Sequence, residues 1–199
     1  MRSGRRGTLA IVALAIVGAL VLSIVASFVA ASAVPLKPYR VPSEAMLPTI
    51  EVNDRVLVET LSDPGRGDIV VLEPPRGADL NTCGAPHPHD QACPRPTRER
   101  SDVTFIKRVV GEPGDRLKVI GGRVHIDGEP LDEDYARLDD SCVVCNLDKE
   151  ITIPADHYFM MGDNRGQSAD SREWGPVPSD WIIGRVFVAY WPPNRIRAL

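Results

Sequence analysis

The chain begins with one continuous apolar stretch. Residues 9–34, LAIVALAIVGALVLSIVASFVAASAV, contain no charged side chain in 26 positions. A helix of this length crosses the roughly 30 Å hydrocarbon layer of a bilayer, so the pattern predicts a transmembrane anchor after a short N-terminus, residues 1–8. A cleaved signal peptide is the competing interpretation, because Ala31-Ser32-Ala33 has the small-x-small form of a processing site. The apolar core of such peptides is only about 7–15 residues long, which favours the anchor.

Beyond residue 35 the hydrophobic positions alternate with a period of two, which is typical of β-strands with one buried face. The predicted strands cover residues 55–60, 68–72, 104–110, 116–120, 123–126, 158–161 and 181–190. Gly121-Gly122 separates two of these runs and predicts a hairpin. No long amphipathic helical pattern follows residue 40. The predicted fold class is therefore mainly β, with an antiparallel sheet after the N-terminal transmembrane helix.

Proline and glycine residues divide the chain after the predicted anchor into segments. We expect a β core over residues 35–120 and 155–199, and a small cap over residues 121–154. Residues 74–101 are Pro-rich and polar, and they contain two cysteines and two histidines. This segment is predicted to be an excursion from the sheet, closed by a disulfide.

Charge restricts the partners and the orientation of the chain. The 23 basic and 27 acidic residues give a net charge of −4, and the three arginines near the N-terminus leave the remainder more acidic still. An acidic domain argues against nucleic acid as a partner, because phosphate binding needs a basic face. Arg2, Arg5 and Arg6 precede the apolar run, whereas Lys37 and Arg40 follow it. This bias predicts a single-pass protein of the cell membrane, in contact with lipid through its anchor and with the domain after the anchor on the extracytoplasmic side.

The four cysteines form two close pairs in the sequence, Cys83 with Cys93 and Cys142 with Cys145. Outside the cytoplasm an even number of cysteines predicts disulfides, and this pairing is the favoured one of three possible connectivities. A zinc site formed by the first pair with His87 or His89 is an alternative, but its spacing matches no strong zinc pattern. A redox role for the second pair lacks the strand-to-helix pattern that surrounds thioredoxin-like sites. We expect no metal and no cofactor.

Lys107 and Arg108 are adjacent in a predicted strand, so their side chains point to opposite faces. One face must be buried, which predicts that one of these two basic residues lies among apolar neighbours. A desolvated lysine can lose its proton, and lowering its pKa from about 10.4 to about 7–8 costs roughly 3–5 kcal/mol. A neutral lysine amine is a general base. The alternative is a surface lysine whose alkyl stem covers apolar neighbours.

Two further segments carry more polar or rigid residues than a sheet requires. Residues 161–175 contain opposite charges two positions apart, Asp163 with Arg165 and Asp170 with Arg172. Such pairs predict a turn that is fixed by charge-assisted hydrogen bonds and can orient other groups. Residues 41–50 contain two prolines and predict a rigid extended loop near the bilayer, or a stiff linker.

In this order, the segments resemble the type I signal peptidases, which are membrane-bound serine proteases with a Ser/Lys dyad. The family pattern Pro-Ser-x-Ser-Met-x-Pro-Thr corresponds to residues 42–49, and Gly-Asp-Ile-Val-Val corresponds to residues 67–71. The block Lys-Arg-x-x-Gly-x-Pro-Gly-Asp corresponds to residues 107–115, and Gly-Asp-Asn-Arg-x-x-Ser-x-Asp-Ser-Arg to residues 162–172. The resemblance covers nearly all of the chain after residue 35. Gly166-Gln167 replaces an Asp-Asn common in the last block.

The resemblance implies a role for several residues of this chain. It places Lys107 at the general base, Ser168 at the serine that positions this lysine, and Ser43 at the oxyanion hole. It makes Asp170 and Arg172 a structural charge pair and places Met46 beside the nucleophile. The nucleophile itself is absent, because Ala45 stands where the family has its attacking serine. A methyl group cannot attack a carbonyl, so the chain is expected to have low activity.

The function implied is endoproteolytic removal of signal peptides from exported preproteins after a small-x-small motif. The substrate would lie extended as an added strand along a sheet edge. One alternative is a relative that binds signal peptides without cutting them. In another, Ser43 is a weak substitute nucleophile, although it lies roughly 6–7 Å along an extended chain from position 45. A further alternative is a membrane-anchored β-domain for assembly or adhesion, and this interpretation makes no prediction about Lys107. The self-cleaving repressors share Ser/Lys chemistry, but the anchor and the cysteines argue against that class.

Overall fold

The computed structural model describes residues 16–23, 35–60, 63–139, 142 and 144–199. The chain divides into two compact units, Met1–Pro35 and Leu36–Leu199. In the first unit, residues 16–23 are helical and exposed. The rest of the predicted anchor, residues 9–34, lies outside the described residues. Within the described part of the chain, no helix combines the length and the apolar character that a membrane crossing requires.

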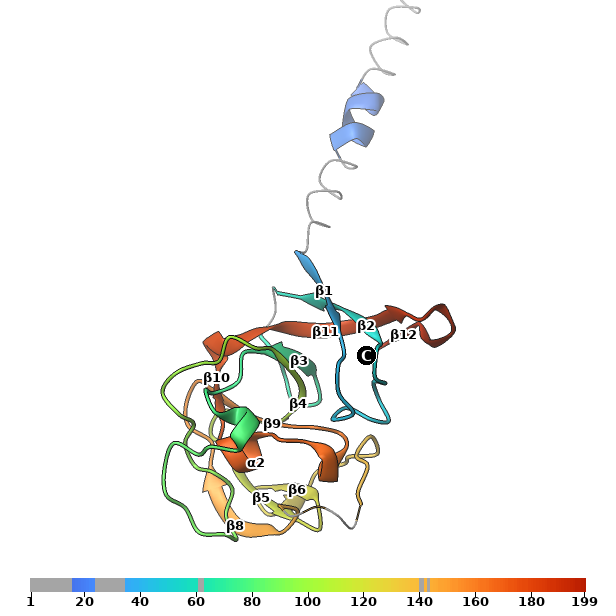
Figure 1. Ribbon diagram of the computed structural model, residues 1–199. Coiled ribbons are helices and arrows are strands. Elements are labelled where there is room, and N and C mark those ends of the chain that lie inside the picture. Colours follow the sequence, from blue (N-terminus) through green and yellow to red (C-terminus); the bar gives the residue numbers. More distant parts are fainter. Residues whose placement is uncertain (1–15, 24–34, 61–62, 140–141, 143) are drawn as a thin grey trace, which may run out of the picture. The chain divides into compact units, whose positions relative to one another are not determined.

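A large antiparallel sheet forms most of the second unit (Figure 1). Its strands are β1 (Leu36–Arg40), β2 (Arg55–Glu59), β3 (Ile69–Leu72), β4 (Phe105–Gly111), β9 (His157–Met161), β10 (Val177–Pro178), β11 (Ile182–Trp191) and β12 (Arg197–Ala198). They follow the order β1-β2-β11-β3-β4-β9-β10, and β12 pairs with β11. β1 is therefore an edge strand, and its Pro38 suits an edge because proline has no N–H to donate to a second partner.

A smaller antiparallel sheet lies at the other end of the unit from β1 and β2 (Figure 1). It contains β5 (Arg116–Ile120), β6 (Arg123–Ile126), β7 (Glu129–Pro130) and β8 (Leu147–Thr152), in the order β7-β6-β5-β8. The predicted glycine hairpin is confirmed, because Ile120 pairs with Arg123 across Gly121 and Gly122. Both glycines have positive φ, 56° and 77°, which this tight turn requires.

Helices are short in the described part of the second unit. They are the α-helix α2 (Ser171–Trp174) and the 3-10 turns η1 (Ala78–Leu80), η2 (Arg165–Gln167), η3 (Ser179–Trp181) and η4 (Pro193–Arg195). Asp170 caps α2 by accepting a hydrogen bond from the Arg172 N–H. The mainly β, antiparallel class is confirmed.

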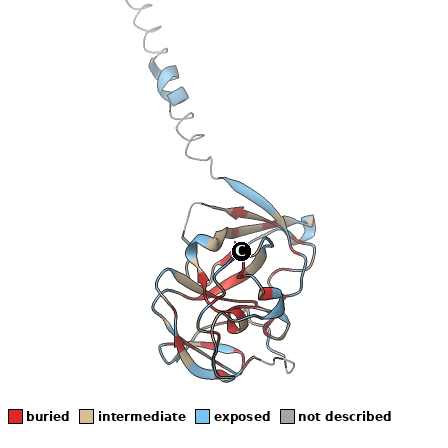
Figure 2. Ribbon diagram, turned by 60° about the vertical axis from the view of Figure 1, so that its left-hand side comes forward, coloured by how far each residue is buried: buried red, intermediate tan, exposed pale blue. Residues whose placement is uncertain are grey.

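Three apolar clusters form the core. One joins the small sheet to β9, a second lies under β2 and β11 with Met46 and Ile50, and a third surrounds Trp174. Figure 2 shows the buried residues concentrated in the interior of this unit. β3 is buried along its whole length, and β4 from Lys107 onward. The sequence predicted that at least one of the two adjacent basic residues of β4 is buried, and in the structure both Lys107 and Arg108 are buried.

All seven predicted strands exist, within one or two residues at each end. The sequence pattern missed β1, β7, β8, β10 and β12, which are short or rich in polar residues. The predicted boundaries of the core and cap remain a prediction. β5 falls within the predicted core, but it pairs with β6 and β8 and is therefore part of the small sheet.

Candidate active site

A pocket of about 310 Å³ lies beside β1 and the first residues of β4. Tyr39 and Arg40 of β1 and the loop that follows them form one part of its wall. Residues 104–107 form another part, and Gln167 and Ala169 complete it. Ser43, Ala45, Met46 and Lys107 all line this pocket. The structure therefore brings together residues that are up to 64 positions apart in the sequence.

Lys107 is 4% exposed, although it lines the pocket. Its ammonium Nζ donates a hydrogen bond of 2.8 Å to Ser168 Oγ and lies 5.6 Å from the centre of the Phe105 ring. Burial lowers the pKa of Lys107 from 10.5 to about 8, against the opposing effect of the nearby Asp170 carboxylate. The neutral amine is thus accessible near physiological pH, as a general base requires.

Ser168 is held against Lys107 by close packing with Gly162. A Cβ atom at position 162 would lie 2.3 Å from Ser168 Oγ and 2.5 Å from the backbone oxygen of Ala45. No real Cβ tolerates such distances, so only glycine allows these two segments to meet here. Gly162 therefore lets the Ser168 hydroxyl and the backbone of position 45 lie next to each other.

Asn164 fixes the loop that carries position 45. Its backbone N–H donates to the Ala45 carbonyl at 3.0 Å, and its side-chain Nδ2 donates to the Glu44 carbonyl at 3.1 Å. Met46 follows and is buried in the core under β2 and β11. Ala45 is 7% exposed at the pocket wall, whereas Ser43 is exposed on it. Hydrogen bonds from Asn164 therefore hold the backbone carbonyls of Glu44 and Ala45, while the side chain at position 45 is only a methyl group.

Asp170 and Arg172 form the predicted charge pair, with Nε and Nη2 of Arg172 each 2.8 Å from a carboxylate oxygen of Asp170. Burial alone would raise the pKa of Asp170, but Arg172 reverses this and holds it below its ordinary value. Asp170 also accepts the Gly162 N–H at 3.0 Å, and Arg172 donates to the Ser168 carbonyl at 3.3 Å. The Asp170–Arg172 pair thus holds both Gly162 and Ser168, which pack against each other beside Lys107.

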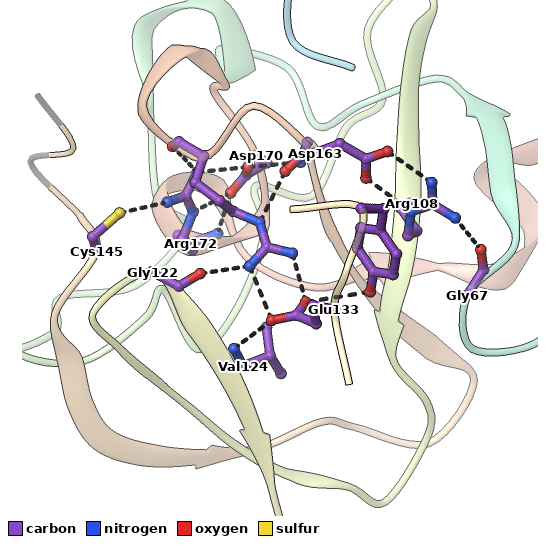
Figure 3. Close-up of polar contacts among 12 residues, drawn as sticks. Gly67, Arg108, Gly122, Val124, Glu133, Cys145, Asp163, Asp170 and Arg172 are labelled. Atoms are coloured by element: carbon purple, nitrogen blue, oxygen red, sulfur yellow. Dashed lines mark hydrogen bonds and ion pairs between the residues drawn. The ribbon is translucent and has the colours of Figure 1, made fainter. Parts of the chain in front are cut away.

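The second predicted pair, Asp163 with Arg165, was wrong. Asp163 accepts two hydrogen bonds from Arg108, at 2.8 and 2.7 Å, and Arg165 pairs with Glu133 of the small-sheet region (Figure 3). Glu133 also accepts the Val124 N–H at 2.8 Å. The side chains of Asp163 and Arg165 point in different directions, so each pairs with a residue that is distant in the sequence.

Sequence reasoning missed three of these residues. Glu133 is a single acidic residue in a region with no recognisable pattern, so nothing in the sequence marked it as buried. Arg108 was marked as basic but not as an ion-pair partner. Asn164 stood within the last motif, yet its hydrogen bonds to the 44–45 backbone depend on a contact across 120 positions.

Both predicted disulfides are present, Cys83–Cys93 and Cys142–Cys145. Their bonding excludes the alternative in which Cys83 and Cys93 bind zinc in this structure. The Cys93 N–H donates to the Arg172 carbonyl at 3.0 Å, and Arg172 Nη1 lies 3.3 Å from Cys142 Sγ. Both disulfides therefore contact the arginine that orients Asp170.

The arrangement provides a buried amine, a hydroxyl that is hydrogen-bonded to it, and a pocket beside a strand edge. β4 pairs with β3 along Phe105–Arg108 but with β9 only from Arg108 onward. Within the described residues, the first part of β4 thus has one side without a strand partner, and so does β1. An extended peptide in the pocket could pair with such an edge. What the site lacks is a nucleophile at position 45.

Comparisons with known proteins agree with this geometry. Residues 11–191 match the family described as "Signal peptidase, peptidase S26". A protein of Leptolyngbya laminosa named "Signal peptidase I" is 40% identical over 163 residues, covering 80% of this chain and 70% of that protein. The Synechocystis protein named "Probable signal peptidase I-2" is 36% identical, covering 80% of this chain and 65% of that protein. The chain thus spans about two thirds of the length of these two relatives.

A solved signal peptidase I from Enterococcus faecalis is 22% identical, with a TM-score of 0.42, and the match covers 63% of this chain and 97% of that one. The family match extends over most of the chain and includes every residue of the pocket. The two bacterial relatives match it at more than one third identity. The chain therefore belongs to the signal peptidase family, peptidase S26, a family of serine endopeptidases.

Proposed function

We propose that this chain has the binding site and the base of a signal peptidase I, and that Ala45 alone prevents it from cutting. Its reaction with a serine at that position is the endoproteolytic removal of signal peptides from exported preproteins after a small-x-small motif. The observation that carries the proposal is the buried contact between Lys107 and Ser168 in a pocket that Ala45 also lines.

Lys107 is assigned the role of general base and Ser168 the role of orienting it. Ser168 Oγ accepts a hydrogen bond from Lys107 Nζ, which directs the amine and leaves a nitrogen lone pair for a proton from position 45 once the amine is neutral. Ser43, on the pocket wall two residues before position 45, is assigned to the oxyanion hole. Asp170 and Arg172 act on the reaction only through the turn that they fix.

The retained base favours an inactivated peptidase over a structural domain. Burying an ammonium group in an apolar pocket destabilises a fold, and a domain for assembly or adhesion would gain nothing from it. A relative that binds signal peptides without cutting them remains a second candidate, because Ala45 itself favours it. The substitute nucleophile Ser43 is a third, and its exposed hydroxyl lies on the same pocket wall.

We further propose that the substrate binds as an extended strand between β1 and the first part of β4. The pocket touches residues of both, and each has one side without a strand partner among the described residues. Val41, Ala45 and Ile106 give the pocket an apolar lining, which suits small aliphatic side chains.

We also propose that residues 9–34 anchor the chain in the cell membrane, with the domain from residue 35 on the extracytoplasmic side. The uncharged length of this segment and the arginines before it support the proposal. Two disulfides in the domain fit an oxidising compartment. Confinement to one membrane would raise the effective concentration of a membrane-bound preprotein at the pocket.

Cleavage of a preprotein in detergent micelles tests the proposal. The chain as it stands, Ala45→Ser, and Ala45→Ser with Lys107→Ala are compared, and the product is sequenced to locate the cut. We expect only Ala45→Ser to cut, after the small-x-small motif. Cleavage by the unaltered chain would instead support Ser43 as the nucleophile. Absence of cleavage by all three, with the signal peptide still bound, would support the binding protein.

A further inference from the structure

The pocket contains a nucleophilic atom that the proposed peptidase reaction uses only as a base. Of the thirteen residues that line it, Lys107 alone carries an amine, and the others with nucleophilic side chains carry hydroxyls. Those hydroxyls belong to Tyr39, Ser43 and Thr104. The family pattern has a serine at position 45. Here that position is a methyl group, so the amine of Lys107 faces the pocket without a hydroxyl at position 45 to compete with it.

We propose that Lys107 is itself a covalent binding site, at which its amine captures aldehydes as a Schiff base. The ligands that fit the pocket are aldehydes with a small aliphatic side chain next to the carbonyl, and above all short extended peptides that end in such an aldehyde. The peptide part of this ligand rests on the proposed function. The covalent step rests on Lys107 and Ala45 alone.

The reaction balances without any oxidant or reductant. The lone pair of neutral Nζ attacks the aldehyde carbon, and the carbonyl oxygen takes a proton to form a carbinolamine. Loss of water then breaks the carbon–oxygen bond and forms the carbon–nitrogen double bond, and the two amine hydrogens leave with that oxygen. Protonation of the imine gives the iminium form. Ser168, whose Oγ lies 2.8 Å from Nζ, has the hydroxyl proton needed to assist departure of the oxygen.

The charges around Nζ favour this adduct over an alternative one. The four charged groups that act on Lys107 are Asp170, Arg172, Glu173 and Asp163. Three of them are acids and one is a base, so these groups disfavour an anionic adduct, whereas burial disfavours any charged form. The same surroundings oppose an anionic carbamate, which a lysine forms with carbon dioxide. These charges therefore favour aldehydes, whose imine can stay neutral, over carbon dioxide as the reactive class.

The environment of Lys107 also makes it selective among the lysines of the chain. Burial lowers the pKa of Lys107 to about 8, so at about pH 8 close to half of the molecules carry Lys107 as the neutral amine. An exposed lysine with a pKa of about 10.4 is less than about 1% neutral there. If reactivity follows the neutral fraction, Lys107 reacts on the order of 100-fold faster than an exposed lysine at about pH 8.

Trapping with sodium cyanoborohydride tests the proposal on the full chain in detergent micelles. The probe is the peptide aldehyde acetyl-Ala-Val-alaninal, and peptide mapping by mass spectrometry measures the rate of adduct formation at each lysine. Lys37 and Lys149 are exposed and act as internal controls. The matched peptide that ends in an alcohol serves as a competitor, and Lys107→Met as the control variant.

We expect rapid labelling of Lys107, and we expect the alcohol competitor to slow it. In Lys107→Met, no lysine should be labelled faster than the exposed lysines. Ala45→Ser should reduce labelling of Lys107 by about tenfold or more, because its hydroxyl adds to the aldehyde first. Labelling of Lys107 no faster than of Lys37 or Lys149, or unaffected by Ala45→Ser, would overturn the proposal. Cleavage by Ala45→Ser is measured separately, so each proposal can fail without the other.

Discussion

Replacing Lys107 by methionine should change how the free energy of unfolding depends on pH. Lys107 is almost fully buried, and its pKa falls from 10.5 to about 8 in the folded protein. The difference of about 2.5, at about 1.4 kcal/mol each, corresponds to a cost of roughly 3 kcal/mol for burying the ammonium form. Methionine keeps the length of the side chain and removes this cost. It also removes the hydrogen bond to Ser168, which contributes about 1 kcal/mol.

The sign of the effect follows from proton binding. Below about pH 8 Lys107 is protonated in both states, so the folded parent bears the whole cost and Lys107→Met is more stable by about 2 kcal/mol. Between about pH 8 and 10.5 the folded state has released a proton that the unfolded state still holds, so the parent gains stability as pH rises. Above about 10.5 the cost is gone, and the parent should be more stable by about 1 kcal/mol.

Urea unfolding of the full chain in detergent micelles, followed by tryptophan fluorescence, measures this difference at a series of pH values. Trp174 is completely buried and reports on the loss of the core. Lys118→Met, which removes a partly exposed lysine from β5, is the matched control and should follow the parent at every pH. Parallel curves for the parent and Lys107→Met would refute the reasoning, because they would mean that burial does not displace the proton of Lys107.

Three other substitutions test one close contact beside Lys107 and two buried ion pairs elsewhere in the domain. Gly162→Ala should destabilise the fold by about 1–3 kcal/mol and abolish cleavage in the Ala45→Ser background, because the new methyl group overlaps Ser168; an unchanged melting curve would contradict this close contact. Glu133→Ala should cost about 3–5 kcal/mol in urea unfolding, since it leaves Arg165 buried without its carboxylate, and a cost below about 1 kcal/mol would show that the pair is solvated. Asp54→Ala should cost about 2 kcal/mol and raise proteolysis of the C-terminal residues, because this buried carboxylate binds two C-terminal arginines; equal proteolysis of both proteins would count against that tie.

Exposed acids provide matched controls for the last two substitutions. Glu129 lies exposed on β7, close in sequence to Glu133, and Glu129→Ala should change the free energy of unfolding by less than about 0.5 kcal/mol. Asp148 is exposed on β8, and Asp148→Ala should likewise have little effect. A large cost at either control would mean that net charge, rather than the specific pairs, determines these results.

Local pattern predicted the strands that alternate and missed those that do not. The run from 116 to 126 has apolar residues at every second position and a two-glycine turn, so its hairpin was predictable. β8, LDKEIT, buries Leu147 and Ile151 but not Lys149 between them, because its register with β5 shifts there: Val119 and Leu117 are two residues apart, whereas their partners Leu147 and Ile151 are four apart. A bulge of this kind breaks the period of two on which the prediction depends.

The candidate site was predictable where one motif contained both partners. Asp170 and Arg172 are two residues apart and pair with each other, as expected. Asp163 pairs with Arg108, which is 55 positions away, and no local rule predicts that choice. The contact of Lys107 with Ser168 was implied by the family resemblance, and only the fold shows that it lies in a pocket with Ala45.

In the proposed mechanism, the neutral amine of Lys107 would activate a nucleophile at position 45. The most direct test is the pH dependence of kcat/KM for preprotein cleavage by Ala45→Ser, which reports the pKa of the base in the free enzyme. Because only the neutral amine accepts a proton, kcat/KM should rise about tenfold for each unit of pH and level off above about pH 8. A profile that is flat across this range, or cleavage that survives Lys107→Met in the same background, would contradict it.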